Sequence, residues 1–159
     1  YNFTTQIVVQ TQIVTLKPKH QIKTKMLNLK WITFPKKRFF GYNKKRFREK
    51  YMYLAEKEKA IVDSLYLPKY CPLDESFKAL QDKKINIKTL IHYALRMDSI
   101  VVLKRVGYLL ELQGIDIYSK VKSKLNERYD LLNPFLPRSK NNSKKWKLNI
   151  NEVFDDTKN

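Results

Sequence analysis

The first third of the chain carries many basic residues and no acidic one, and this restricts its possible folds more than any other feature. The first acidic residue is Glu49, and twelve lysines and arginines precede it. Only the apolar side chains of such a segment can be buried, so its cations must face water or a polyanion. The pattern predicts a sheet with an apolar inner face and a lysine-rich outer face. Aromatic residues are interspersed among the cations: Trp31, Phe34, Phe39, Phe40, Tyr42 and Phe47.

The positive charge of the whole chain is large and unevenly placed. The 159 residues include 33 lysines and arginines against 15 acidic residues, which gives a net charge of +18. A second acid-free stretch, 133–151, adds five cations, whereas the middle of the chain is nearly neutral. Such a surface attracts phosphates, and binding to them releases counterions. Nucleic acid is therefore the first expected partner, and a solvated lysine-rich surface without a partner is the alternative.

The length of the chain favours a single domain that covers residues 1–159. The one cysteine, Cys71, excludes an internal disulfide and is expected to be a small buried hydrophobic residue rather than a nucleophile. The longest aliphatic run, 100–103, is far too short to span a membrane. We therefore expect a cytoplasmic domain without a membrane segment. The sequence does not indicate its oligomeric state.

The beginning of the chain has the composition of β-strands. Segments 7–16 and 26–34 are rich in β-branched or alternating apolar residues, and a proline follows each of them. Two further short strands are expected at 39–42 and 47–54, with 43–45 as the turn between them. These strands should form a mostly antiparallel sheet.

Beyond this region the apolar residues recur with the period of helices. Gly107 falls inside one of the predicted helices, which costs about 1 kcal/mol relative to alanine, so we expect another element to approach it closely. A final strand is expected at 146–150, which completes an α+β fold of N-terminal sheet, about five helices and C-terminal strand. The predicted helices cover 55–66, 73–82 and 100–113, with two more capped by Asn86 and Asp116.

Catalytic or metal-binding patterns are weak in this sequence. His20 and His92 have no cysteine or carboxylate at metal-ligand spacing, which argues against a zinc site. A nuclease would need clustered carboxylates and a lysine, and 82–84 (DKK) with Asp63 or Asp74 supplies the right residue types. These residues are expected on helices rather than on the adjacent strands that such a site requires. We therefore expect a protein that is not an enzyme and binds no cofactor or metal.

Four segments, in order along the chain, together form a recognisable pattern. They are 1–6 (YNFTTQ), 58–65 (EKAIVDSL) with Pro68, 105–111 (RVGYLLE), and 132–134 (LNP) with 146–151 (WKLNIN). This pattern resembles the AbiEi-type antitoxins of abortive-infection, type IV toxin–antitoxin systems. The resemblance covers nearly the whole chain and matches the C-terminal domain of that family, so the family's N-terminal winged helix is expected to lie outside this chain.

The resemblance implies a transcriptional regulator that represses its own operon. In that family the winged helix reads the operator, while the C-terminal domain supports DNA binding and is needed to neutralise a nucleotidyltransferase-like toxin. Double-stranded DNA and such a toxin are thus the implied partners. Basic side chains of this domain would contact the DNA backbone, which positions a protein without specifying sequence. The candidates are Lys36, Lys37, Arg38, Lys44, Lys45, Arg46, Arg48, Lys144, Lys145 and Lys147.

Three alternatives to DNA binding remain open at the level of the sequence. The basic surface would equally suit a protein-interaction module with an acidic partner. RNA binding requires Phe39, Phe40 or Tyr42 on the outer face, where they would stack on bases. The sequence leaves these three rings undecided between core and surface, whereas Trp31 and Phe34 are expected in the core. The metal-dependent nuclease is the third alternative.

Overall fold

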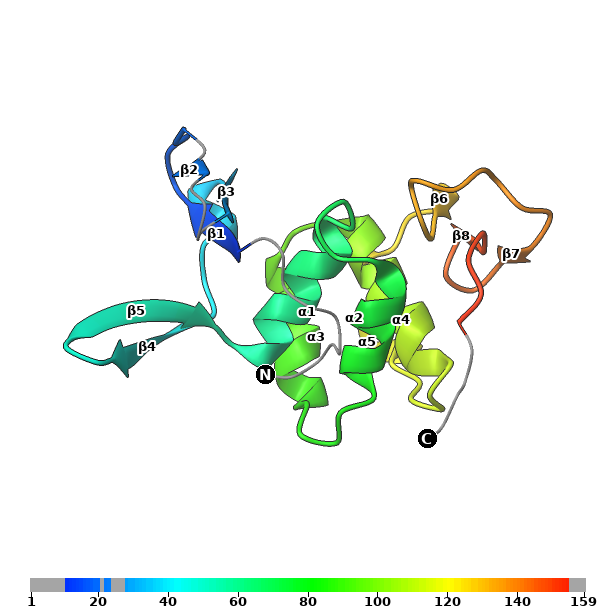
Figure 1. The fold of residues 1–159 in the computed structure, drawn as a ribbon. Coiled ribbons are helices and arrows are strands. Elements are labelled where there is room, and N and C mark those ends of the chain that lie inside the picture. The colour runs from blue at the N-terminus through cyan, green and yellow to red at the C-terminus, as the bar shows by residue number, and fades with distance from the viewer. Residues whose placement is uncertain (1–10, 21, 24–27, 155–159) are drawn as a thin grey trace.

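A computed structural model describes residues 11–20, 22–23 and 28–154, and it confirms the α+β fold. Five α-helices form the centre of the molecule, and strands lie on either side of them (Figure 1). The N-terminal strands β1 to β5 lie on one side, and a small three-stranded sheet near the C-terminus lies on the other. The predicted strand residues 7–10 and 26–27 fall outside the described part of the chain.

The N-terminal strands form two separate sheets rather than one. In the first sheet β3 is central, pairing in parallel with β1 and antiparallel with β2. The second sheet is an antiparallel hairpin of β4 and β5. The strands are β1 (Thr11–Thr15), β2 (Ile22–Lys23), β3 (Asn28–Thr33), β4 (Tyr42–Phe47) and β5 (Lys50–Ala55), and a short 3-10 helix, η1 (Lys36–Arg38), follows β3.

The predicted turn of this hairpin at 43–45 is wrong. Those residues are paired within β4, and the turn consists of Arg48 and Glu49, because Phe47 pairs with Lys50. Arg48 adopts a φ of 54° to make this turn, although it is neither glycine nor asparagine. The base of the hairpin is set by Gly41, at φ 71°, whose carbonyl accepts a hydrogen bond of 2.9 Å from the amide of Glu56. Pairing therefore starts immediately after Gly41.

The five helices lie where the apolar pattern places them. The side chain of Asn86 accepts a hydrogen bond from the amide of Thr89, so its predicted capping role is confirmed. Ser99 directly precedes α4 but makes no side-chain capping bond, and Asp116 accepts a hydrogen bond from the amide of Tyr118. The helices are α1 (Lys57–Tyr66), α2 (Leu73–Leu80), α3 (Ile87–Arg96), α4 (Ile100–Glu111) and α5 (Tyr118–Val121), and a 3-10 turn, η2 (Lys122–Lys124), follows α5.

One hydrophobic core joins the helices to both sets of strands. Phe34, which follows β3, packs into it with the helical side chains, as predicted. Trp31 is only half-buried, whereas Phe40 is buried. From the C-terminal part, Leu132, Trp146 and Leu148 are fully buried in the same core.

The C-terminal part contains a three-stranded sheet instead of a single strand. Its strands β6 (Asp130–Leu131), β7 (Asn142–Ser143) and β8 (Leu148–Asn149) pair in the order β6-β8-β7. Just before β8, the ring of Trp146 lies directly against Gly107 in α4, and its indole N–H donates to Glu111. The expected close approach at Gly107 is thus confirmed.

Two cationic residues of α4 are buried and hold the C-terminal part in place. The guanidinium of Arg105 donates hydrogen bonds to the carbonyls of Leu65 and Leu132, at 2.7 and 2.9 Å. The ammonium of Lys104 forms an ion pair of 2.8 Å with Asp130. Because such groups are costly to bury without partners, these bonds fix β6 against the helices.

Replacing Gly107 by alanine tests the contact with Trp146. On helix propensity alone this change would stabilise the protein by about 1 kcal/mol. Here the added methyl group overlaps with the Trp146 ring, so we expect a loss of roughly 1–3 kcal/mol in the free energy of unfolding, measured by urea denaturation. In a double variant with Trp146→Leu, the loss due to the alanine should shrink. A stabilised Gly107→Ala protein would contradict the contact.

Candidate nucleic-acid interface

The hairpin of β4 and β5 (residues 42–55) projects away from the helical body (Figure 1). All of its residues from 43 to 54 are exposed, including large side chains that are normally buried. Phe47 and Tyr51 are each 61% exposed and Tyr53 is 72% exposed. Contiguous exposed apolar surface of this kind marks an interaction site more often than single exposed residues do.

The outer four cross-strand residue pairs of the hairpin have the same composition. Each pair places a cation opposite an aromatic or large apolar residue. Like charges directly opposite each other would destabilise the hairpin, and this arrangement avoids them on every outer pair. In these four pairs, a cation thus lies opposite each exposed aromatic or apolar side chain. The pairs are Lys44 with Tyr53, Lys45 with Met52, Arg46 with Tyr51, and Lys50 with Phe47.

The two faces of the hairpin differ in character. Residues directly opposite each other share a face, and successive residues alternate between faces. One face therefore carries Lys44, Arg46, Tyr51 and Tyr53, which we call the tyrosine face. On it the ammonium of Lys44 lies 4.4 Å from the centre of the Tyr51 ring. The other face carries Lys45, Phe47, Lys50, Met52 and Leu54.

A groove of about 850 Å³ runs along the base of the hairpin. Its walls are residues 11–14 of β1 and 52–55 of β5, and Tyr42 and Asp63 also line it. The hydroxyl of Tyr42 is buried without a hydrogen-bond partner among the described residues. Burial, and then the charge of Asp63, raise the pKa of this tyrosine well above its usual range. Tyr42 thus belongs to the support of the hairpin rather than to its exposed surface.

The hairpin is attached to the helices through Lys59 of α1. Its side chain is fully buried and forms an ion pair with Asp63, one helical turn further on. Burial lowers the pKa of Lys59 and raises that of Asp63 to about 6, although each of the two charges favours the other. Three rings surround the ammonium with centroids at 4.8 to 5.5 Å and form what we call the aromatic cage: Phe34, Phe40 and Tyr42.

The predicted DNA contacts in η1 differ in their surroundings. Lys36 is exposed, and Lys37 is exposed but forms an ion pair of 2.6 Å with Asp98. Arg38 donates to the carbonyls of Met97 and Asp98, at 2.9 and 3.1 Å, and to the hydroxyl of Tyr66. Its guanidinium is therefore occupied in joining η1 to α1 and the end of α3.

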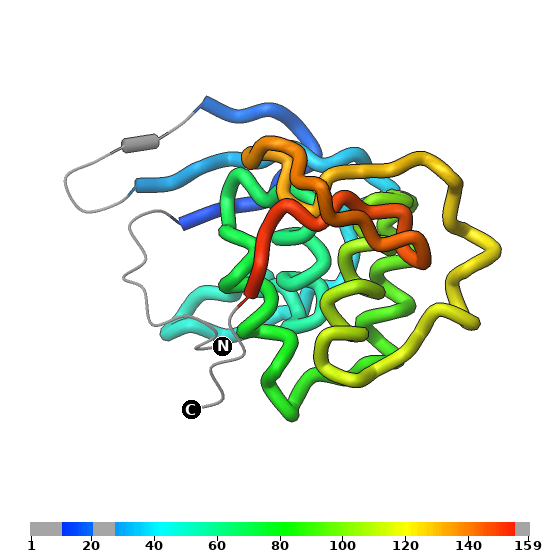
Figure 2. Tube along the Cα trace, turned by 90° about the vertical axis from the view of Figure 1, so that its right-hand side faces the viewer, coloured from blue at the N-terminus to red at the C-terminus, as the bar shows by residue number. Residues whose placement is uncertain are grey.

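The predicted contacts near the C-terminus lie on the other side of the helices from the hairpin (Figure 1). Figure 2, viewed from the C-terminal side, places their sheet in front of the helices and the hairpin behind them. Lys144 is exposed, whereas Lys145 pairs with Glu111 and Asp116 at 3.0 and 3.1 Å. Lys147 pairs with Glu127 at 2.6 Å. The structure does not bring these lysines together with the hairpin cations.

Four predicted contacts do come together on the hairpin: Lys44, Lys45 and Arg46 in β4, and Arg48 in the turn. Sequence reasoning missed Lys50, Tyr51 and Tyr53 as site residues. The available signal was the period of two that places both tyrosines on one face.

The rings of Phe39, Phe40 and Tyr42, which were candidates for stacking on RNA bases, are poorly placed for it because they are buried or packed against other side chains. Phe40 is buried and Tyr42 belongs to the aromatic cage. Phe39 is 38% exposed, but its ring packs against Tyr42 at 5.0 Å between centroids. Any stacking surface therefore lies further out on the hairpin.

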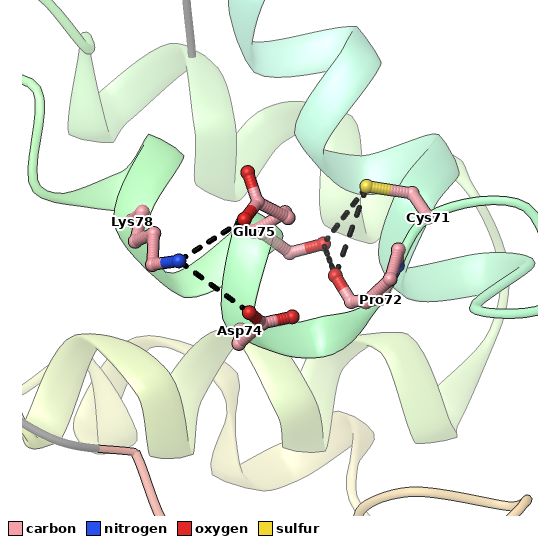
Figure 3. A network of polar contacts seen from close by, with 6 residues as sticks. Cys71, Pro72, Asp74, Glu75 and Lys78 are labelled. Atoms are coloured by element: carbon pink, nitrogen blue, oxygen red, sulfur yellow. Dashed lines mark hydrogen bonds and ion pairs between the residues drawn. The ribbon is translucent and has the colours of Figure 1, made fainter. Parts of the chain in front are cut away.

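The possible nucleophile Cys71 and the possible metal ligand Asp74 contact neighbouring residues at the start of α2 (Figure 3). Cys71 is half-buried, close to Pro72 and Ser76, and burial raises the pKa of its thiol, which disfavours the nucleophilic thiolate. Asp74 pairs with Lys78 at 3.5 Å, as does Glu75 at 3.0 Å.

The carboxylates of the nuclease hypothesis pair with separate lysines. Asp82 follows the end of α2 and pairs with Lys57 at 3.4 Å, while Asp63 pairs with Lys59. In the described part of the chain no group of three or more histidine, cysteine or carboxylate side chains is arranged to hold a metal ion. None of the described helices is long and apolar enough to cross a membrane.

Comparison with known proteins gives no assignment. The chain matches no protein-family model, no curated protein and no solved structure. The functional argument therefore rests on the hairpin and its support.

The pair of Asp63 and Lys59 predicts a characteristic pH dependence of stability. The pKa of Asp63 is about 6 in the folded protein against 3.8 ordinarily, so the folded state binds this proton more tightly than the unfolded state. The resulting stabilisation is present below about pH 4 and is lost as the pH rises through 6. The free energy of unfolding of the wild type, relative to Asp63→Asn, should fall by roughly 1–3 kcal/mol between pH 4 and 6.

Asp98→Asn serves as the control for this measurement. Asp98 is exposed, and Lys37 lowers its pKa. Its stabilising contribution is therefore gained mainly as the pH rises towards 4, so the corresponding difference should change little between pH 4 and 6 and should not fall. A flat difference for Asp63→Asn across this range would contradict the raised pKa.

Proposed function

We propose that this chain is a non-enzymatic regulatory domain that contacts the DNA phosphate backbone through the hairpin of β4 and β5. The observation that carries the proposal is the concentration of five exposed cations on one projecting ribbon: Lys44, Lys45, Arg46, Arg48 and Lys50. A two-stranded ribbon has dimensions that fit the major groove of DNA. Phosphate contacts would neutralise the mutual repulsion of these cations and release counterions.

The surroundings of the other predicted cations support this assignment. Arg38, Lys145 and Lys147 are engaged with acidic or carbonyl groups of other elements, whereas the hairpin cations are exposed. Arg46 donates a hydrogen bond of 3.1 Å to the carbonyl of Arg48, which lies within the hairpin itself. Lys36 lies just before the hairpin and can extend the same contact surface. The lysines near the C-terminus are proposed only as a weaker, separate contact, because the helices stand between them and the hairpin.

The resemblance to AbiEi-type antitoxins gives this activity a biological setting. In such a protein a winged helix reads the operator, and this domain would clamp the DNA backbone beside it. A nucleotidyltransferase-like toxin would then be the protein partner, a role that the resemblance alone supports. The motif residues Arg105, Gly107 and Glu111 all contact the C-terminal part of this chain: Arg105 donates to the carbonyl of Leu132, and Gly107 and Glu111 contact Trp146.

The salt dependence of DNA binding tests the proposal. The variant Lys44→Gln/Lys45→Gln/Arg46→Gln loses three phosphate contacts, so the slope of log K against log salt for duplex DNA should decrease by up to about 3. The measurement is fluorescence anisotropy at several salt concentrations. The matched control, Lys120→Gln/Lys122→Gln/Lys124→Gln, removes three exposed charges near α5 and should retain most of the slope. Equal losses in both variants would indicate an effect of net charge alone, and no binding at low salt would refute the proposal.

A further inference from the structure

The tyrosine face of the hairpin has features that contact with phosphates does not require. Tyr51 and Tyr53 are the most exposed rings of β5, two residues apart and therefore on one face. Arg46 and Lys44 stand directly opposite them on β4. Cations alone would suffice to bind a backbone, so the two exposed rings need a separate explanation.

We propose that the tyrosine face binds unpaired nucleotides, with bases stacked on Tyr51 and Tyr53 and phosphates at Lys44 and Arg46. This inference rests on the proposed function and specifies which form of nucleic acid the hairpin prefers. Stacking on aromatic side chains is tolerant of sequence because every base has a flat face, and it combines naturally with a basic strand that follows the backbone.

The spacing of the two rings favours single strands over duplex. Residues two apart on a strand lie about 7 Å from each other. Bases within a duplex are about 3.4 Å apart, and neighbouring base pairs cover both of their faces. A duplex therefore offers no free base face to rings at this spacing. An extended single strand can place one base on each ring or one base between them.

Lys44 links the proposed phosphate-binding part of the site to the proposed base-stacking part. Its ammonium lies 4.4 Å from the centre of the Tyr51 ring and so covers the ring when no ligand is bound. A phosphate attracts the ammonium more strongly than a ring does, because it carries a full negative charge. Binding of the backbone would thus draw Lys44 aside and free the face of Tyr51 for a base.

The charge of the hairpin favours a polynucleotide over a protein as the occupant. Between residues 42 and 55, Glu49 is the single acidic residue against five cations. A protein partner would have to supply several carboxylates together with an apolar surface. A single-stranded nucleic acid supplies regularly spaced negative charges and flat rings in the same chain, which matches the alternation of cation and aromatic residue along the hairpin.

Binding of the intact chain to a labelled thymidine oligonucleotide of about 12 nucleotides, a length within known single-strand site sizes, tests the inference. A duplex of the same length is measured at the same salt concentration. We expect the single strand to bind more tightly. Tyr51→Leu and Tyr53→Leu keep apolar bulk but remove the flat ring, and each should weaken single-strand binding roughly 5- to 150-fold with little effect on the duplex.

Two further variants separate stacking from a structural role. Tyr53→Trp keeps a flat ring, so it should retain single-strand affinity, and its tryptophan fluorescence should be quenched by the oligonucleotide beyond the change seen in the wild type. Phe135→Leu removes a ring that is equally exposed but lies away from the hairpin, in the segment between β6 and β7, and should change nothing. Circular dichroism of each variant confirms that it is folded.

The outcomes distinguish this inference from the proposed function. If both tyrosine variants bind the single strand as the wild type does, or if the wild type prefers the duplex, stacking is overturned while the salt dependence of backbone binding can still hold. If neither nucleic acid binds at low salt, both proposals fail. Binding of an acidic peptide with greater affinity than the oligonucleotide would identify a protein as the partner and overturn the inference.

Discussion

The burial of the Lys59 ammonium is the interaction on which the arrangement of the N-terminal half depends. Removing an ammonium from water costs several kcal/mol unless other groups compensate. Here the carboxylate of Asp63 and the aromatic cage provide that compensation. Since the lysine belongs to α1 and the rings belong to residues 34–42, the same contact that satisfies the charge also fixes β3 and the start of the hairpin to the helices. Gly41 is part of this arrangement, because a Cβ at that position would lie 3.0 Å from the Lys59 stem.

This support explains how a two-stranded ribbon can project into solvent. An isolated hairpin is marginally stable in water, and it needs a third strand or packing against another element. Among the described residues, the hairpin obtains that packing at its base, where the rings of Phe40 and Tyr42 lie against Lys59 of α1. Further out, stability depends on the cross-strand pairs, each of which joins a cation to an aromatic or apolar side chain. The same pairs thus stabilise the outer part of the hairpin and form its exposed surface.

The sequence predicted the parts of this fold that have local causes. The position of Asn86 before an apolar repeat predicts its role as a helix cap. Gly107 predicts the close approach of another element, because a glycine inside a helix is unfavourable unless a side chain would not fit there. The turn of the hairpin was misplaced because Asn43 has the chemistry of a turn residue and Arg48 has not, yet pairing from Gly41 onward leaves Arg48 in the turn. For the candidate site, charge alone could not separate Arg38 and Lys145 from Lys44, because the groups that engage the first two lie far away along the chain.

The described cations differ in the groups that they contact. In this chain of net charge +18, Lys104 of α4 and Lys145 and Lys147 beside the C-terminal sheet each form an ion pair with an acidic side chain. On the hairpin, Lys44 and Arg48 instead lie over the rings of Tyr51 and Phe47, which attract them far less than carboxylates do and leave the positive charge facing solvent. These pairs stabilise the ribbon without neutralising its charge, so the charge would still be available to a polyanion. The exposed cations and rings of the hairpin are therefore the feature on which the proposed binding of a polyanion rests.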